Sequence, residues 1–203
     1  MNRLVLIIVC FVFCLNVSSR PIRDVWLEMP DSIIPHVNKK IRKELLHLID
    51  MKMPSEANNL LGEKTVIDTL TSEYMSVALS ESLLLQMRLL PAIGGDSILC
   101  VVRSYGTSFK ESVVSLYTPY WKKISDIEFD INMFVHKPDT MQTEKYEELK
   151  LMLDPYLISA ELSEYDDTLV VSASATNISN EDKILLDAIF LQRKFKWNGR
   201  VFN

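Results

Sequence analysis

The sequence predicts an α+β fold in which helices pack against an antiparallel β-sheet of about six to nine strands. Two observations predict it. Apolar and polar residues alternate with a period of two over much of residues 72–117, and apolar residues recur at helical spacing over residues 32–52 and 143–153. No strand alternates with a long helix in the βαβ manner, which disfavours a parallel doubly wound sheet. A β-sandwich with helical insertions is the alternative.

The first 19 residues have the pattern of a secretory signal peptide. Arg3 and the amino terminus are positive, residues 4–15 form an unbroken apolar run, and Val17-Ser18-Ser19 is a small-residue cleavage pattern. The run is about half of the roughly 20 residues that cross a bilayer, which disfavours a retained membrane anchor. We therefore expect a signal peptide over residues 1–19 and a single secreted domain over residues 20–203, with no transmembrane segment after cleavage.

Charge and cysteine content narrow the function classes of the mature chain. Removal of Arg3 leaves 21 basic against 27 acidic side chains, a net charge of −6, whereas nucleic-acid-binding domains usually carry a positive excess. We therefore expect no nucleic-acid partner. Only Cys100 stays in the mature chain, so no internal disulfide forms, and its apolar neighbours predict a small buried hydrophobe.

The first predicted helix spans residues 32–52, with Ser32 as its N-cap and Pro54 ending it. Its polar side carries His36 and His47, which lie about 16 Å apart along a helix and cannot share a metal ion. We expect this side to be solvated, the alternative being a basic contact patch. The patch would consist of Lys39, Lys40, Arg42 and Lys43. The predicted core-facing residues are Ile33, Val37, Ile41, Leu45, Leu48 and Ile49.

An antiparallel meander follows this helix. In its first two strands, residues 75–79 and 83–89, apolar residues occupy one face, and Gln86 and Arg88 alternate with them on the other. Further strands are predicted at residues 98–105, 113–117 and 122–129, with turns at residues 80–82, 91–96 and around Gly106.

The second half of the chain predicts another helix and two hairpins. Residues 143–153 form the helix, with Thr143 as cap and Pro155 beyond its end, packed on the same sheet face as the first or at an edge. Strands at 157–162 and 169–175 flank the acidic turn 164–167. A short helix should follow Ser179, and Asn198-Gly199 joins a closing hairpin.

The order of several segments resembles a known family. These are WLEMPDSIIP, LTSEYMSVALSES, LLLQMRLLP, VVRSYG, SLYTPYW, LDPYLISAEL and FKWNGRVF. Together with the signal peptide they resemble a secreted protein family of unknown function found in Bacteroidetes (domain of unknown function 3256). The resemblance implies a periplasmic or cell-surface setting and supplies no activity, cofactor or site residue.

The segment DIEFDIN, residues 126–132, is the candidate metal site. Asp126, Glu128, Asp130 and Asn132 occupy every second position and would project from one face of a strand, and calcium favours such oxygen ligands. An EF-hand loop is excluded, because the chain has Ile131 where that loop needs glycine. The alternative is a half-buried strand with a solvated acidic face.

An aromatic cluster in SLYTPYW is the candidate ligand- or partner-binding site. Tyr117, Tyr120 and Trp121 could stack on a sugar or a peptide if their rings are exposed. The alternative is that they cover an edge of the core.

Two functions from different classes therefore stay open. The first is a non-catalytic secreted or periplasmic module that binds a protein or surface ligand and needs no cofactor. The second is an envelope hydrolase that uses the acids of residues 126–132 with His136 as base, which requires these groups to converge in a cleft. Motifs such as GxSxG, HExxH, CxxC and GxGxxG are absent from the sequence, which favours the first.

Overall fold

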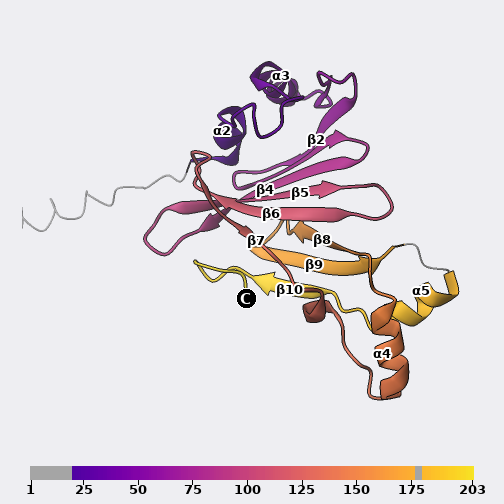
Figure 1. Cartoon of the computed structure of the whole chain (residues 1–203). Coiled ribbons are helices and arrows are strands. Elements are labelled where there is room, and N and C mark those ends of the chain that lie inside the picture. The colour runs from indigo at the N-terminus through magenta and orange to yellow at the C-terminus, as the bar shows by residue number, and fades with distance from the viewer. Residues whose placement is uncertain (1–19, 177–179) are drawn as a thin grey trace, which may run out of the picture.

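A computed structural model describes residues 20–176 and 180–203 of the chain (Figure 1). The predicted signal peptide and Ser179 lie outside the described residues. The α+β class and the antiparallel meander are confirmed, but the strands form two sheets instead of one. The order is β1-β2-β3-β4-β5-β6-β7 in the large sheet and β10-β9-β8 in the small sheet.

Every strand pairing in both sheets is antiparallel. The large sheet contains β1 (Glu56–Asn58), β2 (Lys64–Leu70), β3 (Tyr74–Ser80), β4 (Leu83–Pro91), β5 (Ser97–Tyr105), β6 (Glu111–Tyr117) and β7 (Lys123–Ile127). The small sheet contains β8 (Tyr156–Leu162), β9 (Thr168–Ala175) and β10 (Arg193–Lys196). Of these, β1 and β2 were not predicted from the sequence.

The first predicted helix is shorter than expected. Instead of spanning residues 32–52, α3 covers Lys39–Asp50, and an unpredicted helix, α2 (Ile22–Leu27), precedes it. The cap is Asn38, not Ser32, because the Asn38 side chain accepts hydrogen bonds from the backbone N–H groups of Lys40 and Ile41. Residues 31–37 form turns instead.

Helices α2 and α3 cover one face of the large sheet (Figure 1). The core between them holds the alternating apolar residues of β3 and β4 that the period of two predicted. These are Met75, Val77, Leu79, Leu85, Met87 and Leu89. From the helices, Ile41 and Leu45 of α3 and Trp26 of α2 complete this core.

Arg42 is part of this layer and not of a basic surface patch. Its side chain is only 1% exposed, and it donates hydrogen bonds to the backbone oxygens of Val37 (2.7 Å) and Met29 (2.5 Å). Its guanidinium also pairs with Asp31 at 2.9 Å. Arg42 therefore fixes the turns that lead into α3, and the basic patch that was the alternative to a solvated side loses one of its four residues.

The small sheet covers the opposite face of the large sheet. This second core is one apolar cluster that includes Cys100 and Val102 of β5, Leu116 of β6, Leu162 of β8 and Val171 of β9. The expected burial of Cys100 is thereby confirmed, because its exposed fraction is 0%.

Polar residues of β4 are buried at this second interface. Gln86 accepts a hydrogen bond from the Leu162 backbone N–H (3.1 Å), and Arg88 donates from Nε to Asp167 Oδ1 (2.8 Å). The alternation along β4 alone predicted a polar face for Gln86 and Arg88; the small sheet buries that face.

The second helix, α4 (Thr143–Leu151), does not pack on the large sheet as predicted. It lies with α5 (Asn180–Asp187) at one end of the small sheet, away from α2 and α3 (Figure 1). Leu149 and Leu153 form a third apolar cluster with Ala175 of β9 and with Leu186 and Ile189. This helix begins after Gln142, so Thr143 is its first residue and not its cap.

Candidate functional site

The turn between β6 and β7 separates the three candidate aromatic residues. Tyr117 and Trp121 are buried, with exposed fractions of 5% and 7%, and their ring centroids lie 5.5 Å apart. Trp121 Nε1 donates a hydrogen bond to the backbone oxygen of Val25 in α2 at 2.8 Å. These two residues anchor the turn to the helical layer.

The backbone of Trp121 adopts a left-handed conformation, with φ of 64°. Such a conformation costs a residue with a β-carbon of order 1 kcal/mol, and the surrounding contacts must offset it. Hydrogen bonds from Trp121 N to Thr118 O (2.9 Å) and from Thr118 N to Lys122 O (2.9 Å) close the turn. The turn therefore folds Trp121 inward and presents Tyr120 at its tip.

Tyr120 is 78% exposed and lies at the rim of a hollow of about 430 Å³. The guanidinium of Arg20 lies 5.3 Å from the centre of the Tyr120 ring, a cation–π distance. We call this site the Tyr120 hollow; its lining includes Arg20, Asp96, Ile98, Thr118, Tyr120 and Ile124. Of the three predicted aromatics, only Tyr120 is available to a ligand.

Sequence reasoning missed Arg20, Asp96 and Ile124. One signal could have found Asp96: in a meander, alternate turns lie at the same end of the sheet. The turn of residues 92–96 follows β4 and the turn of residues 118–122 follows β6, so both lie at one end. Arg20 carried no such signal, because only α2 brings it beside the β6–β7 turn.

The acidic residues of 126–132 do not share one strand face. The predicted strand of residues 122–129 ends at Ile127, and Ile131–Phe134 form a 3₁₀ helix whose N-cap is Asp130. The Asp130 side chain accepts a hydrogen bond from Asn132 N at 2.8 Å. Within residues 20–176 and 180–203, no group of three or more His, Cys, Asp or Glu side chains is arranged to hold a metal ion.

Asp126 is engaged locally. Lys123 Nζ and Ser115 Oγ each donate to its carboxylate at 2.7 Å. These hydrogen bonds hold the pKa of the Asp126 carboxyl below its ordinary value. The carboxylate is therefore ionised at neutral pH, which suits a charged rim better than a general acid.

His136 lies on a different part of the molecule. Its backbone N–H donates to Ile189 O at 2.8 Å, next to the bridge between Val135 and Phe190. Its side chain is exposed, and no hydrogen bond among the described residues joins it to Asp126, Glu128 or Asp130. The convergence that the hydrolase hypothesis requires is not found in the described part of the chain.

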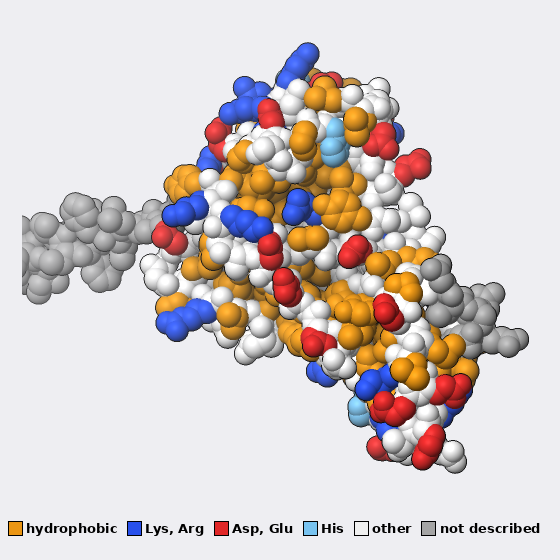
Figure 2. All heavy atoms as spheres, viewed as in Figure 1, with side chains coloured by type: hydrophobic (Ala, Val, Ile, Leu, Met, Phe, Trp, Pro, Cys, Tyr) orange, Lys and Arg blue, Asp and Glu red, His pale blue; other side chains and the backbone are white. Residues whose placement is uncertain are grey.

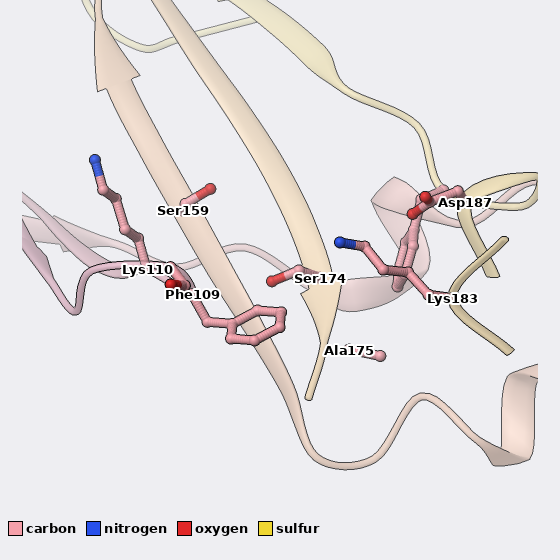
Figure 3. A pocket seen from close by; sticks show the side chains of 9 residues that line it. Phe109, Lys110, Ser159, Ser174, Ala175, Lys183 and Asp187 are labelled. Carbon is pink, nitrogen blue, oxygen red and sulfur yellow. The ribbon is translucent and has the colours of Figure 1, made fainter. Parts of the chain in front are cut away.

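A second hollow, of about 280 Å³, lies between β8, β9 and α5. Figure 3 shows the amino group of Lys183 directed toward Ser174, with Lys110 and Ser159 on the other side. Both lysines are exposed, and the hydrogen bonds of the described residues join neither of them to a serine. The hollow thus offers cations and hydroxyl groups but no built catalytic pair.

The protein is an α+β protein with two antiparallel sheets, in which helices cover one face of the large sheet and the small sheet covers the other. The chain belongs to the family described as protein of unknown function (DUF3256), whose profile matches residues 14–202. A comparison with curated proteins found no match.

A solved structure shares the fold. It is a domain of an uncharacterized protein from Porphyromonas gingivalis W83, 21% identical, with a TM-score of 0.70 over 92% of this chain and 98% of that chain. Among the described helices, none has the length and apolar character needed to cross a bilayer.

Proposed function

We propose that this protein is a non-catalytic binding module of the bacterial cell envelope, secreted or periplasmic, and that the Tyr120 hollow binds a glycan. One observation carries the proposal: a large aromatic ring, 78% exposed, stands on a turn that two buried aromatics anchor. An exposed ring that the core does not use provides stacking surface for a ligand, and its rigid support lowers the entropy lost on binding.

The groups around the ring suit a saccharide. A sugar presents a flat face of C–H groups, which stacks on an aromatic ring, and hydroxyl groups around it. The hollow supplies a hydrogen-bond donor in the Arg20 guanidinium and an acceptor in the Asp96 carboxylate. The Thr118 hydroxyl can act as either. Ile98 and Ile124 add apolar surface. Such a mixture of apolar lining and few polar groups is typical of small-ligand sites.

The experiment measures binding of the purified chain to envelope glycan fragments by calorimetry. Tyr120→Ala should weaken binding about tenfold, the value of one stacking contact. Tyr165→Ala is the matched control, because Tyr165 is 88% exposed on the β8–β9 turn and lines no part of the Tyr120 hollow. Equal affinities of Tyr120→Ala and wild type, or binding of envelope peptides alone, would contradict the glycan proposal.

The envelope location has its own test. The signal pattern of residues 1–19 supports export, and the Porphyromonas source of the similar structure suggests a Bacteroidetes host for the test. Mass spectrometry of the protein expressed in a Bacteroidetes host should find a mature chain that begins at Arg20 in the periplasmic or extracellular fraction. A full-length chain in the cytoplasmic fraction would contradict export.

A further inference from the structure

The large sheet leaves part of β6 without a neighbour. β7 pairs with β6 only from Val114 to Tyr117, although β6 begins at Glu111. Residues 111–113 therefore have a strand partner on the β5 side only. After Ile127 the chain leaves the sheet and runs toward the small sheet (Figure 1), so the place of a β7 continuation is not taken by any described strand.

The edge strand of the small sheet reaches the same place. In an antiparallel ladder, successive residues direct their backbone groups alternately to the two sides. The hydrogen bond from Ser163 N to Thr168 O (2.9 Å) shows that the backbone groups of Ser163, and of every second residue before it in β8, point toward β9. The backbone groups of the residues between them, 156, 158, 160 and 162, therefore point away from β9.

Two of these four residues are bonded by the large sheet. Gln86 of β4 accepts from Leu162 N at 3.1 Å, and Ser112 Oγ of β6 donates to Ala160 O at 3.4 Å. The outward backbone groups of Tyr156 and Ile158 receive no such bond from the described residues. Beyond β6, β8 is thus an open edge.

These two edges border a hollow of about 420 Å³, which we call the β6–β8 notch. Its apolar part includes Val113 and Tyr156, 37% and 40% exposed, and Ile158. Open edges with exposed apolar side chains invite pairing with another chain, and proteins usually cover or charge them.

The rim of the notch is acidic. Glu111, Asp126 and Glu128 line it, and no lysine or arginine does. Lys123 already pairs with Asp126, whereas neither Glu111 nor Glu128 forms a salt bridge within residues 20–176 and 180–203. Figure 2 shows acidic side chains, with Lys and Arg side chains among them, beside apolar surface across the middle of the visible face. Lys123 and Arg103 both attract the Asp126 carboxylate, so the negative charge of the notch that no described ion pair offsets is that of Glu111 and Glu128.

We propose that the β6–β8 notch binds an extended segment of a partner protein in which basic and apolar side chains alternate, and that this segment adds as a strand beside residues 111–113 of β6. Addition of a strand satisfies open backbone groups, and alternate side chains then face opposite ways. Apolar side chains of the segment would contact Tyr156 and Ile158 on the face of β6 from which Ser112 reaches β8. Basic side chains would face Glu111 and Glu128 on the opposite face, which also carries Val113. The notch shares no lining residue with the Tyr120 hollow, so each proposal can fail without the other.

The test uses the full chain, purified after processing by its host, and a fluorescent acetyl-Lys-Val-Lys-Val-Lys-amide peptide. Fluorescence polarisation should detect binding below about 1 mM, and the Glu-Val-Glu-Val-Glu counterpart should bind at least about tenfold more weakly. Two further peptides carry N-methyl groups on one or the other alternate set of amides. At least one should lose about tenfold in affinity, because methylation removes the N–H that pairs with an edge. Equal affinity for both methylated peptides and the parent overturns strand addition.

Variants of the chain locate the site. Glu111→Gln with Glu128→Gln should weaken binding of the basic peptide about tenfold. Glu44→Gln with Glu63→Gln is the matched control, because both glutamates are exposed, lie outside the notch and change the net charge equally. Equal effects of the two pairs, or no binding of the basic peptide, overturn the proposal. If the chain self-associates and the basic peptide disrupts that association, the notch binds a second copy of the chain, and the proposal of a different partner protein is overturned.

Discussion

Gln86 joins the two sheets, and its removal should destabilise the whole fold. Its side chain is 4% exposed, accepts from Leu162 N at 3.1 Å, and donates from Nε2 to the Tyr74 hydroxyl at 2.9 Å. Gln86→Leu keeps a similar volume but leaves the Leu162 N–H without an acceptor and the Tyr74 oxygen without this donor. Both groups are buried, with residue exposures of 2% and 4%.

Each such orphan costs about 1–3 kcal/mol, and the added apolar contact of leucine returns about 1 kcal/mol. We therefore expect Gln86→Leu to lower the free energy of unfolding by about 3 kcal/mol. Adding Tyr74→Phe removes the buried hydroxyl that Gln86→Leu leaves without its donor. The loss of stability in the double variant should therefore be smaller, by about 1–2 kcal/mol, than the sum of the losses in the two single variants.

Urea unfolding followed by tryptophan fluorescence and circular dichroism measures both quantities. Gln142→Leu is the control, because Gln142 is exposed and makes no side-chain cap bond, and it should change stability by less than about 0.5 kcal/mol. A loss below about 0.5 kcal/mol for Gln86→Leu, or strictly additive losses in the double variant, would refute the role of this bridge between the sheets.

Three further outcomes follow from the described contacts. Gly106→Ala should destabilise the protein by about 3 kcal/mol in the same urea assay, because φ is 105° and a β-carbon there would lie 2.1 Å from the Phe109 backbone oxygen. Gly95→Ala is the control and should cost only about 1 kcal/mol, because φ is 96° but no atom lies within 4 Å of the added β-carbon. Equal losses in the two variants would contradict the clash at Gly106. Burial raises the pKa of the Cys100 thiol to about 12, so a thiol reagent at pH 8 should label it only in denaturant, and rapid native labelling would contradict its burial. Hydrogen bonds, chiefly from basic side chains, lower the pKa of several carboxyls below their ordinary values. These are Glu28, Asp50, Asp126 and Asp166. The stability that these ionised carboxyls add to the fold is therefore complete above about pH 4 to 5 and is lost as the pH falls through their folded-state pKa values. The melting temperature should drop between about pH 5 and pH 3, and a rise over that range would contradict these pairings.

Local patterns predicted the elements whose environment depends on near neighbours in the chain. The period of two along β3 and β4 placed the alternating apolar residues from Met75 to Leu89 on one buried face. The helical spacing around Leu45 correctly predicted Ile41, Leu45 and Ile49 on the core-facing side of α3, but it placed Leu48 there as well and missed Leu46. The same reasoning failed at Ser32, because Asn38 offers a better-placed cap and the preceding residues form turns. It also missed β1 and β2, short or weakly apolar strands at the sheet edge.

The candidate sites depended more strongly on contacts between distant segments. SLYTPYW identified the turn, but Val25, 96 residues away, accepts the hydrogen bond that holds Trp121 inside. The acids of residues 126–132 were recognised from composition, yet the end of β7 at Ile127 dispersed them. Two of them, Asp126 and Glu128, instead line the β6–β8 notch.

By itself the sequence determined the α+β class, the meander, the amphipathic helix and the burial of Cys100, since periodicity follows from each strand or helix and its immediate neighbours. Only the tertiary structure decided that a second sheet covers Gln86 and Arg88, that Arg42 is internal, and that Tyr120 alone is exposed. Those outcomes depend on partners far along the chain: Gln86 meets Leu162 across 76 residues, and Arg88 meets Asp167 across 79. A polar residue in an alternating strand has the same local pattern whether water or another sheet faces it.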